Sequence, residues 1–576
     1  MASLDSRFLA PLLAPLLALL AWTGAAAAEG VAFDWFEYTG RDATQAAPLP
    51  AGSYRNPILA CFYPDPSVTR VGDRYYLVNS TFTHFPGIPV HESRDLVHWR
   101  LIGHALEDPA ALHFDGLDVS RGVFAPSIRF HDGLFYVINT LVDAGGNFLV
   151  TARNPAGPWS APVWLKEIDG IDPSLFFDRD GRAYIVNNGM PDRPPLYDGH
   201  RAIWIQAFDL ATLKLVGPRK VLVDGGTDIA RRPVWIEGPH LYHVGGWYYL
   251  MCAEGGTAAG HSEVVFRARS PWGPFESYKG NPILTQRDLP AGRADPITNA
   301  GHADLVQMRD GSWWAVFLAS RPYEGDRYNT GRETFLLPVH WQDGWPVILG
   351  AGAAIPTLLK GPAALAGKGA GGAPPGDVLA GNFTARDAFD GDAPGPEWLQ
   401  VYAPAQRWFE LTGGALRIHP LAANLDQKRN ASFLARRQQH LHFDASTQLV
   451  PPTAPGVAAG LAAYQNQDHW YFLGTRRSGD GQQVFLERDA GTGVQLAASV
   501  QLGAATIAPT TAAPAAGPLR LRISGDGARY SFFYDAGQGW QALREGDDAS
   551  ILSTEVAGGF VGTVLGPFAR QEAIDR

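Results

Sequence analysis

Three acidic side chains stand at matching places in a repeated sequence pattern. The pattern occurs five times, and three of its copies open with an acid: Asp65, Asp172 and Glu237. Hydrolysis of a glycosidic bond needs two carboxyl groups in different protonation states, one to protonate the leaving oxygen and one to handle the nucleophile. A third carboxylate near the acid raises the pKa of that acid by like-charge repulsion. The three acids therefore indicate glycoside hydrolysis if the fold brings them together.

Each copy of the pattern predicts a strand, a tight turn of Gly or Asp, and a second strand rich in aromatic residues. The first core residues of the copies lie about 47 to 66 residues apart, at Val68, Ile128, Leu175, Leu241 and Leu305. A four-stranded propeller blade takes roughly 40 to 50 residues, and insertions lengthen it. The spacing predicts an all-β fold with a five-bladed propeller whose first strands line a central channel. An isolated Asp-Pro-Ser is typical of a simple turn, but three acids in register at strand starts favour catalysis in one pit.

The composition describes a globular protein and excludes one class of partner. The chain has 576 residues, 46% of them hydrophobic and 18% charged, which indicates two folded domains rather than a disordered chain. Gly (65), Pro (44) and Trp (17) are plentiful, as expected for many strands joined by turns, with aromatic rings available for sugar faces. The net charge of −10 argues against nucleic acid as a partner, because phosphate binding needs clustered Lys and Arg.

The N-terminus is typical of an export signal. Arg7 precedes an apolar run from Phe8 to Trp22, and small residues follow up to Ala28. A membrane anchor is the alternative, but the run is short and is broken by two prolines. We expect cleavage of the signal, no membrane association afterwards, and a periplasmic or secreted mature protein.

Beyond the repeats the composition and hydrophobic pattern of the sequence change twice. An Ala/Gly/Pro-rich stretch is followed by short alternating runs separated by Gly and Asp, which favour a β-sandwich of the concanavalin or jelly-roll kind. The predicted organisation is a signal peptide at residues 1–28, an N-terminal lead-in at 29–54, the propeller at 55–355, a linker at 356–380 and the sandwich at 381–576. The chain has two cysteines, Cys61 and Cys252. Export permits a disulfide between them, but their places in different blades favour two buried free thiols.

The sequence around the acids resembles a known enzyme family. FYPDPSV with Asp65, GIDPSLF with Asp172 and EGPHLY with Glu237 are similar to the three catalytic motifs of glycoside hydrolase family 43. Further segments resemble the β-xylosidase and α-L-arabinofuranosidase branch of that family, and RDAFDG and GGFVG resemble its appended β-sandwich. The resemblance implies that Asp65 is the general base, that Glu237 is the general acid, and that Asp172 tunes the pKa of Glu237 and touches the sugar. It also implies inversion at the anomeric carbon.

The same resemblance suggests residues that bind substrate. Arg332 in GRET is similar to an arginine that grips the sugar hydroxyls, although a salt bridge with Glu333 is the alternative. Phe82 resembles an aromatic wall of the sugar pocket, with plain core packing as its alternative. Phe124 stands where many relatives have Trp, so the pocket wall is smaller there. Glu254 either bonds substrate or pairs with an arginine.

Two further residues complete the predicted site. His302 opens the fifth repeat and is expected to face the channel, as a hydrogen-bonded histidine rather than a metal ligand, because calcium prefers oxygen ligands. The resemblance requires no cofactor but allows a calcium ion near His302. Phe560 in GGFVG is a candidate for an aromatic that the sandwich inserts near the leaving group. Alternatively, the sandwich binds carbohydrate as an independent module.

These features predict an exo-acting, inverting hydrolase that takes terminal pentoses from xylo-oligosaccharides or arabinoxylan fragments. A β-D-xylosidase is the first hypothesis. An α-L-arabinofuranosidase, or a bifunctional enzyme, is the alternative, because one or two side chains decide between pentoses with overlapping hydroxyl positions. A non-catalytic carbohydrate-binding propeller is an alternative of another class, but it predicts the loss of one of the three acids. A fructan-cleaving enzyme on a similar scaffold would retain configuration instead.

Overall fold

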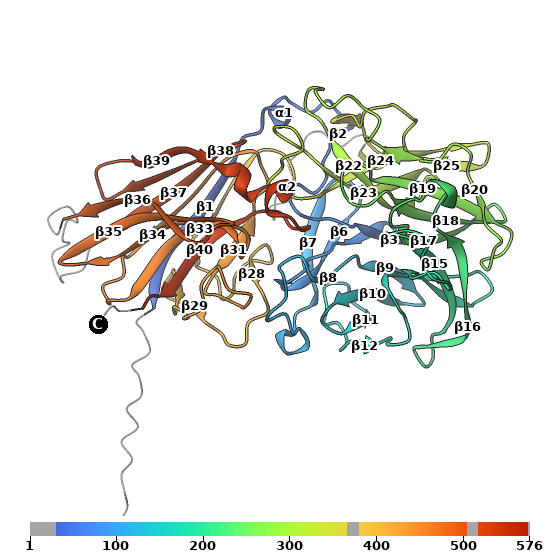
Figure 1. Ribbon diagram of the computed structural model, residues 1–576, viewed down its shortest axis with the longest axis horizontal. Helices are drawn as coiled ribbons and strands as arrows, with labels where there is room; N and C mark the ends of the chain where they lie inside the picture. Colours follow the sequence, from blue (N-terminus) through green and yellow to red (C-terminus); the bar gives the residue numbers. More distant parts are fainter. Residues whose placement is uncertain (1–29, 366–378, 504–516, 574–576) are drawn as a thin grey trace, which may run out of the picture.

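The computed structural model describes residues 30–365, 379–503 and 517–573. The predicted signal peptide and the middle of the predicted linker lie outside these residues. Figure 1 shows two all-β bodies side by side, a propeller on the right and a sandwich on the left. Helices are limited to short turns at α1 (Ala43–Ala46), α2 (Thr554–Ala557), η1 (Pro109–Ala111), η2 (Ile229–Arg231), η3 (Ala363–Leu365) and η4 (Ala549–Leu552).

The five predicted hairpins form the inner halves of five blades, which confirms the propeller. The first blade consists of β3 (Ser67–Val71), β4 (Arg74–Val78), β6 (Gly87–Ser93) and β7 (Trp99–Leu106). The second consists of β9 (Ser127–His131), β10 (Leu134–Val142), β11 (Gly146–Ala152) and β12 (Val163–Trp164), with β8 (Gly122–Val123) also paired to β10.

The remaining blades follow the same order. The third consists of β13 (Ile171–Phe177), β14 (Ala183–Gly189), β15 (Ala202–Asp209) and β16 (Lys214–Asp224). The fourth consists of β17 (Glu237–Val244), β18 (Trp247–Glu254), β19 (Ser262–Ala268), β20 (Glu276–Ser277) and β21 (Leu284–Thr285). The fifth consists of β22 (Thr298–Gln307), β23 (Trp313–Ser320), β24 (Glu333–Gln342) and β25 (Trp345–Val347).

The first strands of the blades form a closed ring. β3 contacts β9, β9 contacts β13, β13 contacts β17, β17 contacts β22, and β22 returns to β3. The residues before β3 tie the ends together, because the backbone N–H groups of Ile58 and Leu59 donate to the Thr334 carbonyl of β24. A short sheet of β2 (Ser53–Arg55) and β26 (Leu358–Lys360) lies outside the blades, so the predicted linker begins with a paired strand.

The sandwich has two antiparallel sheets of eight strands, and its core lies between them. The first sheet contains β29 (Phe409–Leu411), β30 (Leu416–Ile418), β1 (Val31–Gly40), β32 (His442–Leu449), β37 (Leu519–Asp526), β38 (Arg529–Asp535), β39 (Gln541–Asp548) and β27 (Phe383–Asp387). The second contains β36 (Gln495–Leu502), β35 (Gly481–Ala490), β34 (His469–Ser478), β33 (Val457–Asn466), β40 (Val564–Gln571), β31 (Leu434–Arg437), β28 (Leu399–Val401) and β5 (His84–Phe85).

Two strands cross between the bodies, and neither is foreseen by the sequence analysis. The predicted lead-in contains β1, which pairs with β32 and β27 inside the sandwich and appears in Figure 1 as a blue strand among orange ones. In return, β5 of the first blade pairs with β28 at the edge of the second sandwich sheet. A single hydrophobic core joins the two bodies, since Phe62 and Phe82 of the propeller belong to the same cluster as Phe568 of the sandwich.

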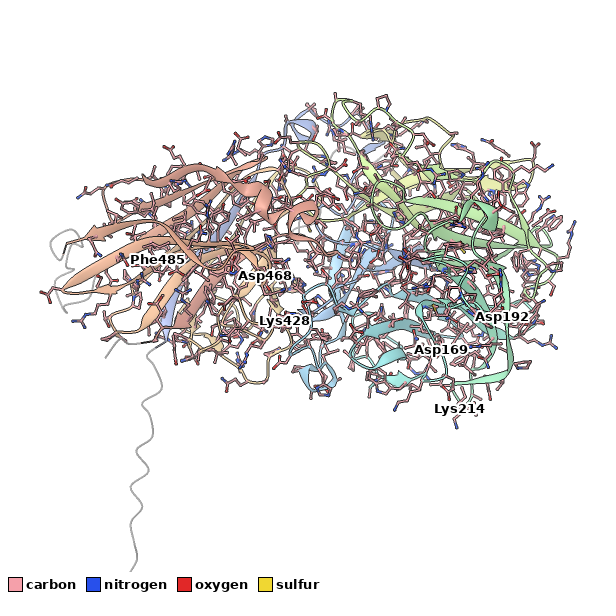
Figure 2. All side chains as sticks on the ribbon, in the orientation of Figure 1. Asp169, Asp192, Lys214, Lys428, Asp468 and Phe485 are labelled. Carbon is pink, nitrogen blue, oxygen red and sulfur yellow. The ribbon has the colours of Figure 1, made fainter. Side chains whose placement is uncertain are left out.

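Polar contacts also hold the two bodies together. Lys428 lies between them in Figure 2, and it forms an ion pair with Asp118 of the propeller. The backbone N–H of Gly116 donates to the Lys428 carbonyl at 2.7 Å. The sandwich is therefore a fixed neighbour of the propeller.

Candidate active site

The same unusual backbone turn occurs at or just before the start of three inner strands, β3, β13 and β17, and within a fourth, β22. Asp65, Asp172, Gly238 and His302 all have φ between 52° and 56°, in the left-handed region. In β13, β17 and β22 the pairing with the next strand also shifts register at this point, as in a β-bulge. A non-glycine residue in this region costs free energy, and such residues cluster at functional sites. At this turn the side chain leaves the regular strand pairing and faces the channel. In the fourth blade the side chain that does so belongs to Glu237, the residue before Gly238.

Glu237 stands one residue earlier in its repeat than Asp65 and Asp172 do in theirs, four residues before the core residue Leu241 rather than three. The position that matches Asp65 and Asp172 is Gly238, and Glu237 precedes it. A Cβ at Gly238 would lie 2.9 Å from the ring of His302, so the inner strand of the fourth blade needs glycine there. The carboxylate is therefore supplied by the neighbouring residue, which still lines the same pit.

The three acids share one cavity at the channel mouth. Its volume is about 490 Å³, within the range of small-molecule sites. All of Asp65, Asp172 and Glu237 are at least 93% buried. The cavity is lined by Asp65, Phe82, Arg121, Phe124, Ala125, Val142, Ile171, Asp172, Val234, Trp235, Glu237, Gly256, Thr257, His302, Arg332 and Phe560.

Asp65 is held as a carboxylate. Arg332 Nη1 lies 3.2 Å from its Oδ1, the Ser80 hydroxyl donates to its Oδ2 over 2.5 Å, and His302 Nδ1 lies 3.9 Å from its Oδ1. Burial alone would raise the pKa of Asp65, but the Arg332 guanidinium, His302 and the Ser80 hydroxyl outweigh burial and lower this pKa below its usual value. Asp65 is therefore ionised over the whole neutral range.

Asp172 and Glu237 have the opposite tendency. Burial raises the pKa of Asp172 to about 6, with His302 opposing the shift and Asp65 adding to it. Asp172 accepts a hydrogen bond from the backbone N–H of Gly238 at 3.1 Å, next to Glu237. Burial, then Asp172, then Asp65 raise the pKa of Glu237 well above its usual value. The carboxyl group of Glu237 makes no hydrogen bond to the described part of the chain, so its proton is available to a ligand.

One pit thus contains an ionised carboxylate and a protonated carboxylic acid. Groups whose environments push their pKa values apart are the usual acid and base of a hydrolase. The arrangement can activate a water molecule at Asp65 while Glu237 protonates a leaving oxygen. The structure places all three acids where the sequence analysis expects them, in a shared cavity.

Aromatic rings form one wall of the cavity and come from both bodies. Phe82 and Phe560 stack with ring centroids 6.0 Å apart, and Phe124 packs edge-on against both. Phe560 belongs to the sandwich, so the cavity is closed on that side by the second body. Phe82 lines the cavity and is also part of the hydrophobic core, at 1% exposure. Both readings of Phe82 in the sequence analysis therefore describe it.

Arg332 and Glu333 do not form the salt bridge that was the alternative for Arg332. Glu333 is paired with Arg321 at 2.7 Å, whereas Arg332 faces Asp65 and lies over the rings of Phe560 and Phe82, at 5.4 and 6.0 Å. Its Nε has no hydrogen-bond partner among the described residues.

The two contacts suggested for Glu254 are not the ones that the structure contains. Glu254 accepts hydrogen bonds from the backbone N–H and the hydroxyl of Thr227, at 2.8 and 3.0 Å. It does not line the cavity and has no ion pair with an arginine in the described ranges. Glu254 braces the loop before Trp235 instead.

Several residues in and around the cavity were not found from the sequence. Ser80 supports Asp65, and Arg121 is bound to Asp143 at 2.6 Å and lies 5.6 Å over the ring of Phe124. Trp235 has φ of 50° and stacks under Arg201 at 3.9 Å. These residues lie in loops between repeats, where no periodic pattern marks them.

A second site with a buried acid, Asp304, lies farther along the channel. Asp304, two residues beyond His302, accepts hydrogen bonds from Ser67 Oγ at 2.7 Å, from the Arg129 guanidinium at 2.8 Å and from the Tyr242 hydroxyl at 2.6 Å. These partners come from the first, second and fourth blades. Burial would raise the pKa of Asp304, but Arg129 and the other donors hold it below its usual value.

The described residues contain no group of three or more His, Cys, Asp or Glu side chains placed to hold a metal ion. The carboxylate nearest to His302, that of Asp65, is already engaged by Arg332 and Ser80. The side chains around His302 therefore do not fit a calcium ion, which prefers six to eight oxygen ligands. Calcium near His302 stays a prediction of the resemblance, and no step of the chemistry is assigned to it.

Other predicted features are placed as follows. Both Cys61 and Cys252 are buried free thiols, as favoured. No helix in the described ranges is long and apolar enough to cross a bilayer.

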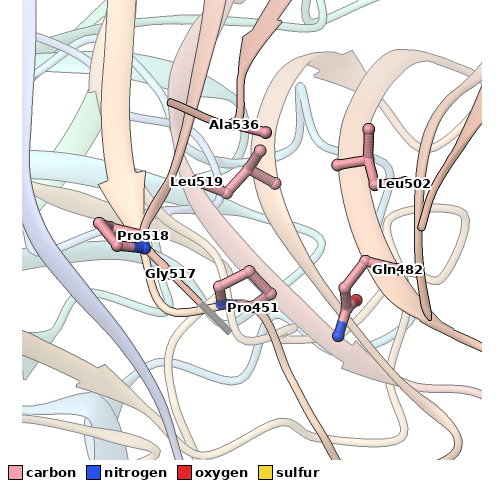
Figure 3. Close-up of a pocket in the computed structure, with 7 residues that line it drawn as sticks. All are labelled: Pro451, Gln482, Leu502, Gly517, Pro518, Leu519 and Ala536. Carbon is pink, nitrogen blue, oxygen red and sulfur yellow. The ribbon is translucent and has the colours of Figure 1, made fainter. Parts of the chain in front are cut away.

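The hollow of the sandwich shown in Figure 3 has a volume of only about 10 Å³, room for one water at most, and is lined by Pro451, Gln482, Leu502, Gly517, Pro518, Leu519 and Ala536. No sugar ring fits there.

Known protein families match both bodies of the chain. Residues 54–346 match the Glycosyl hydrolases family 43, and residues 386–575 match the Beta xylosidase C-terminal Concanavalin A-like domain. The first range contains all five blades. The second contains the strands of the sandwich except β1, β5 and the first part of β27.

Relatives of similar length share both bodies. A xylosidase/arabinosidase from Butyrivibrio fibrisolvens is 37% identical over 522 residues, which are 89% of this chain and 95% of the relative. A non-reducing end alpha-L-arabinofuranosidase from Bacteroides ovatus is 37% identical over 528 residues, 90% of this chain and 91% of the relative. A solved GH43_12 structure retrieved from capybara gut metagenome is 37% identical, with a TM-score of 0.86 over 94% of this chain and 99% of its own. The xylan beta-1,4-xylosidase from Bacillus halodurans is 32% identical, with a TM-score of 0.77 over 90% and 97%.

Proposed function

Because the chain belongs to the glycosyl hydrolases of family 43, we propose that it is an exo-acting glycosidase that releases terminal pentoses from hemicellulose oligosaccharides. The single observation that carries the proposal is the cavity in which an ionised Asp65 and a protonated Glu237 meet. The substrates named for the relatives support the choice of pentoses. We favour β-D-xylosidase activity on xylo-oligosaccharides as the main reaction.

The proposed chemistry is a single displacement. Asp65 removes a proton from a water molecule, whose oxygen forms the new bond to the anomeric carbon. The bond to the leaving oxygen breaks on the opposite face, and Glu237 gives its proton to that oxygen. Asp65 ends protonated and Glu237 ends ionised, and exchange with solvent restores both. The product has inverted configuration, since the water attacks opposite to the leaving group.

The remaining groups have supporting roles in this proposal. Asp172 keeps Glu237 protonated by like-charge repulsion and orients it through the Gly238 backbone. The guanidinium of Arg332 and the ring of His302 line the cavity and face the sugar hydroxyls. The ring of Phe560 closes one side of the cavity, so a long polysaccharide cannot pass through, and a chain end enters instead. This shape supports trimming of terminal sugars over cleavage in mid-chain.

α-L-Arabinofuranosidase activity is the second candidate, and the name of the Butyrivibrio relative covers both activities. Rates on nitrophenyl β-D-xylopyranoside and nitrophenyl α-L-arabinofuranoside, measured side by side, separate the two. Release of products from a panel of arabinoxylan fragments then identifies the natural linkage. A faster xyloside reaction by tenfold or more supports the main proposal, and the reverse ratio assigns the arabinofuranosidase.

The stereochemical course tests the mechanism itself. Proton NMR of the xylose first released from nitrophenyl β-D-xylopyranoside is expected to show the α-anomer before mutarotation. Initial formation of the β-anomer would mean a covalent intermediate, as in retaining enzymes, and would overturn the role of Asp65 as a base. Absence of any hydrolysis, together with sugar binding, would favour the carbohydrate-binding alternative.

The place of action remains the one predicted from the N-terminal sequence. We propose export to the periplasm or the medium, supported by the apolar run and the small residues before Glu29. Activity in the periplasmic or medium fraction, with a new N-terminus near Glu29 found by sequencing, would agree with this proposal. Intact enzyme confined to the cytoplasm would contradict it.

A further inference from the structure

The segment that carries Arg332 is held by the sandwich. The backbone N–H of Tyr328 donates to Ser553 Oγ at 3.1 Å, and Asn329 Nδ2 donates to the Ala549 carbonyl at 3.0 Å. In the other direction, the backbone N–H of Thr563 donates to the Asn329 carbonyl at 2.8 Å. Residues 549–563 of the sandwich, here called the clamp segment, therefore fix the backbone three residues before Arg332.

The closest approach is between two glycines. Gly331 has φ of 74°, and a Cβ there would lie 2.9 Å from the Cα and N of Gly562. A Cβ on Gly562 would lie 2.7 Å from the Thr330 carbonyl oxygen. Contacts below 3.0 Å force something to move, and here the obstacle is backbone rather than a flexible side chain. The two bodies meet with no room for one methyl group, directly beside the arginine.

The sandwich also supports the strand start that carries Asp65. Arg437 of β31 donates from Nε to the Phe62 carbonyl at 3.0 Å, and its guanidinium lies 4.9 Å over the ring of Phe62 and 4.3 Å over that of Tyr63. Phe62 is also the side chain that a Cβ on Gly331 or Gly562 would touch. Phe62, Gly331 and Gly562 thus pack together beside the segments that carry Asp65 and Arg332.

We propose that the sandwich positions the Asp65–Arg332 pair, with Gly562 and Arg437 as positioning residues for the general base. Neither residue lines the cavity, so neither touches the substrate. Their contribution differs from that of Phe560, which is part of the cavity wall. The inference rests on the proposed function only in taking Asp65 as the group that activates water.

The positioning role has a signature in the pH dependence. Arg332 is the strongest of the groups that lower the pKa of Asp65. If the clamp segment moves Arg332 away, the pKa of Asp65 rises, and the acidic limb of the kcat/KM profile moves to higher pH. A purely structural role of the same contacts would lower the melting temperature and leave that limb in place.

The test compares two single-methyl substitutions in the full-length enzyme. Gly562→Ala introduces a Cβ against Thr330, at a residue whose φ is not in the left-handed region. Gly292→Ala is the matched control, because Gly292 also lacks a left-handed φ and has open space around its Cβ position. We expect Gly562→Ala to lower kcat/KM about 10- to 100-fold and to move the acidic limb up by about 0.5 pH unit or more. The control should match the wild type in both.

Arg437→Met is the second variant and keeps the inference testable if Gly562→Ala folds poorly. This variant also removes a positive charge that lies over the ring of Tyr63, two residues before Asp65. A shift of the acidic limb therefore counts as a change of position only if it persists in Arg437→Lys, which keeps the charge. Arg437→Lys, which keeps the charge but not the Nε donor to Phe62, should restore little of the lost activity. Limbs unchanged in both folded variants would overturn the positioning role.

Failure of the inference and failure of the proposed function give different results. If Asp65→Asn keeps wild-type activity, then Asp65 is not the base and the proposed function fails. If Asp65→Asn is inactive while Gly562→Ala and Arg437→Met keep the wild-type acidic limb, the proposed function stands and the positioning role is wrong.

Discussion

The propeller channel contains two sites with buried carboxyl groups, and the sites differ in the number of acids that each cation serves. At the mouth, the three acids Asp65, Asp172 and Glu237 all lie near the guanidinium of Arg332, and Arg201 adds a weaker attraction at Glu237. Farther along the channel, Asp304 alone holds the guanidinium of Arg129 and further donors as well. Both clusters are buried, and both are built from the inner strands of several blades.

The difference teaches how the same strands serve structure and chemistry. A buried charge that is fully paired does not change its protonation state near neutral pH, and its hydrogen bonds hold together the strands that supply them. Three acids around one cation cannot all ionise, so protons stay available at the mouth. We therefore expect substitutions at the mouth to remove activity with little loss of stability, and substitutions at Asp304 to do the reverse.

The largest expected effect comes from Asp65→Asn. The variant cannot accept a proton from the attacking water, and general-base removal costs up to about 10⁴-fold in kcat. Hydrolysis of xylobiose should fall by about that factor, while the melting temperature stays near that of the wild type. A loss of less than tenfold would remove Asp65 from the chemistry and would end the contrast between the two clusters.

Asp304→Ala should have the largest effect on stability. It leaves Arg129 as an unpaired buried charge, and breaking a buried pair costs about 3–5 kcal/mol. Calorimetry should show earlier unfolding of the propeller. The double variant Asp304→Leu with Arg129→Met is the control, since replacing both partners by apolar groups recovers much of this cost. An unchanged unfolding temperature for Asp304→Ala would show that this cluster is not structural.

The smallest expected effect is that of Glu254→Gln, a third kind of buried acid. Gln keeps one acceptor for Thr227 and loses the other, so we expect a stability loss of about 0.5–1.5 kcal/mol and a change in kcat/KM below about tenfold. Glu254→Ala should destabilise the protein further. A loss of kcat/KM by about 10³-fold in Glu254→Gln, without unfolding, would place Glu254 among the groups that meet the substrate.

The blades and the three acids could be predicted because their signals are local. Each hairpin carries its own turn and aromatic strand, and each acid stands beside a Pro or Gly that marks the strand start. The offset of Glu237 can be read from the sequence, since Glu237 stands four residues before Leu241 whereas Asp65 and Asp172 stand three residues before Val68 and Leu175. Its physical reason, the close approach of Gly238 to His302 across two blades, needs the structure. The ion pair of Arg332 with Asp65 could not be predicted either. Glu333 follows Arg332 in the sequence, but adjacent residues in extended chain point to opposite faces, so they do not pair with each other.

The exchange of strands between the bodies could not be predicted for a related reason. β1 is separated from its partner β32 by about 400 residues of sequence. The sequence of a ten-residue strand does not specify which strand it pairs with. The same holds for the meeting of Gly331 and Gly562. Long-range pairing depends on the whole core, which periodicity in one segment does not encode.

The division of protons between Asp65 and Glu237 is tested most directly by the pH dependence of kcat/KM for the wild type and Glu237→Gln. Asp65 must be ionised, so activity falls as pH drops through its lowered pKa; Glu237 must be protonated, so activity falls as pH rises through its raised pKa. A nitrophenyl glycoside needs little help from an acid, and the variant should still cleave it. We predict a bell-shaped wild-type profile on xylobiose and, for Glu237→Gln on the nitrophenyl glycoside, loss of the alkaline fall with the acidic limb unchanged. An alkaline fall that persists in the variant at the wild-type pH would contradict the assignment of Glu237 as the acid.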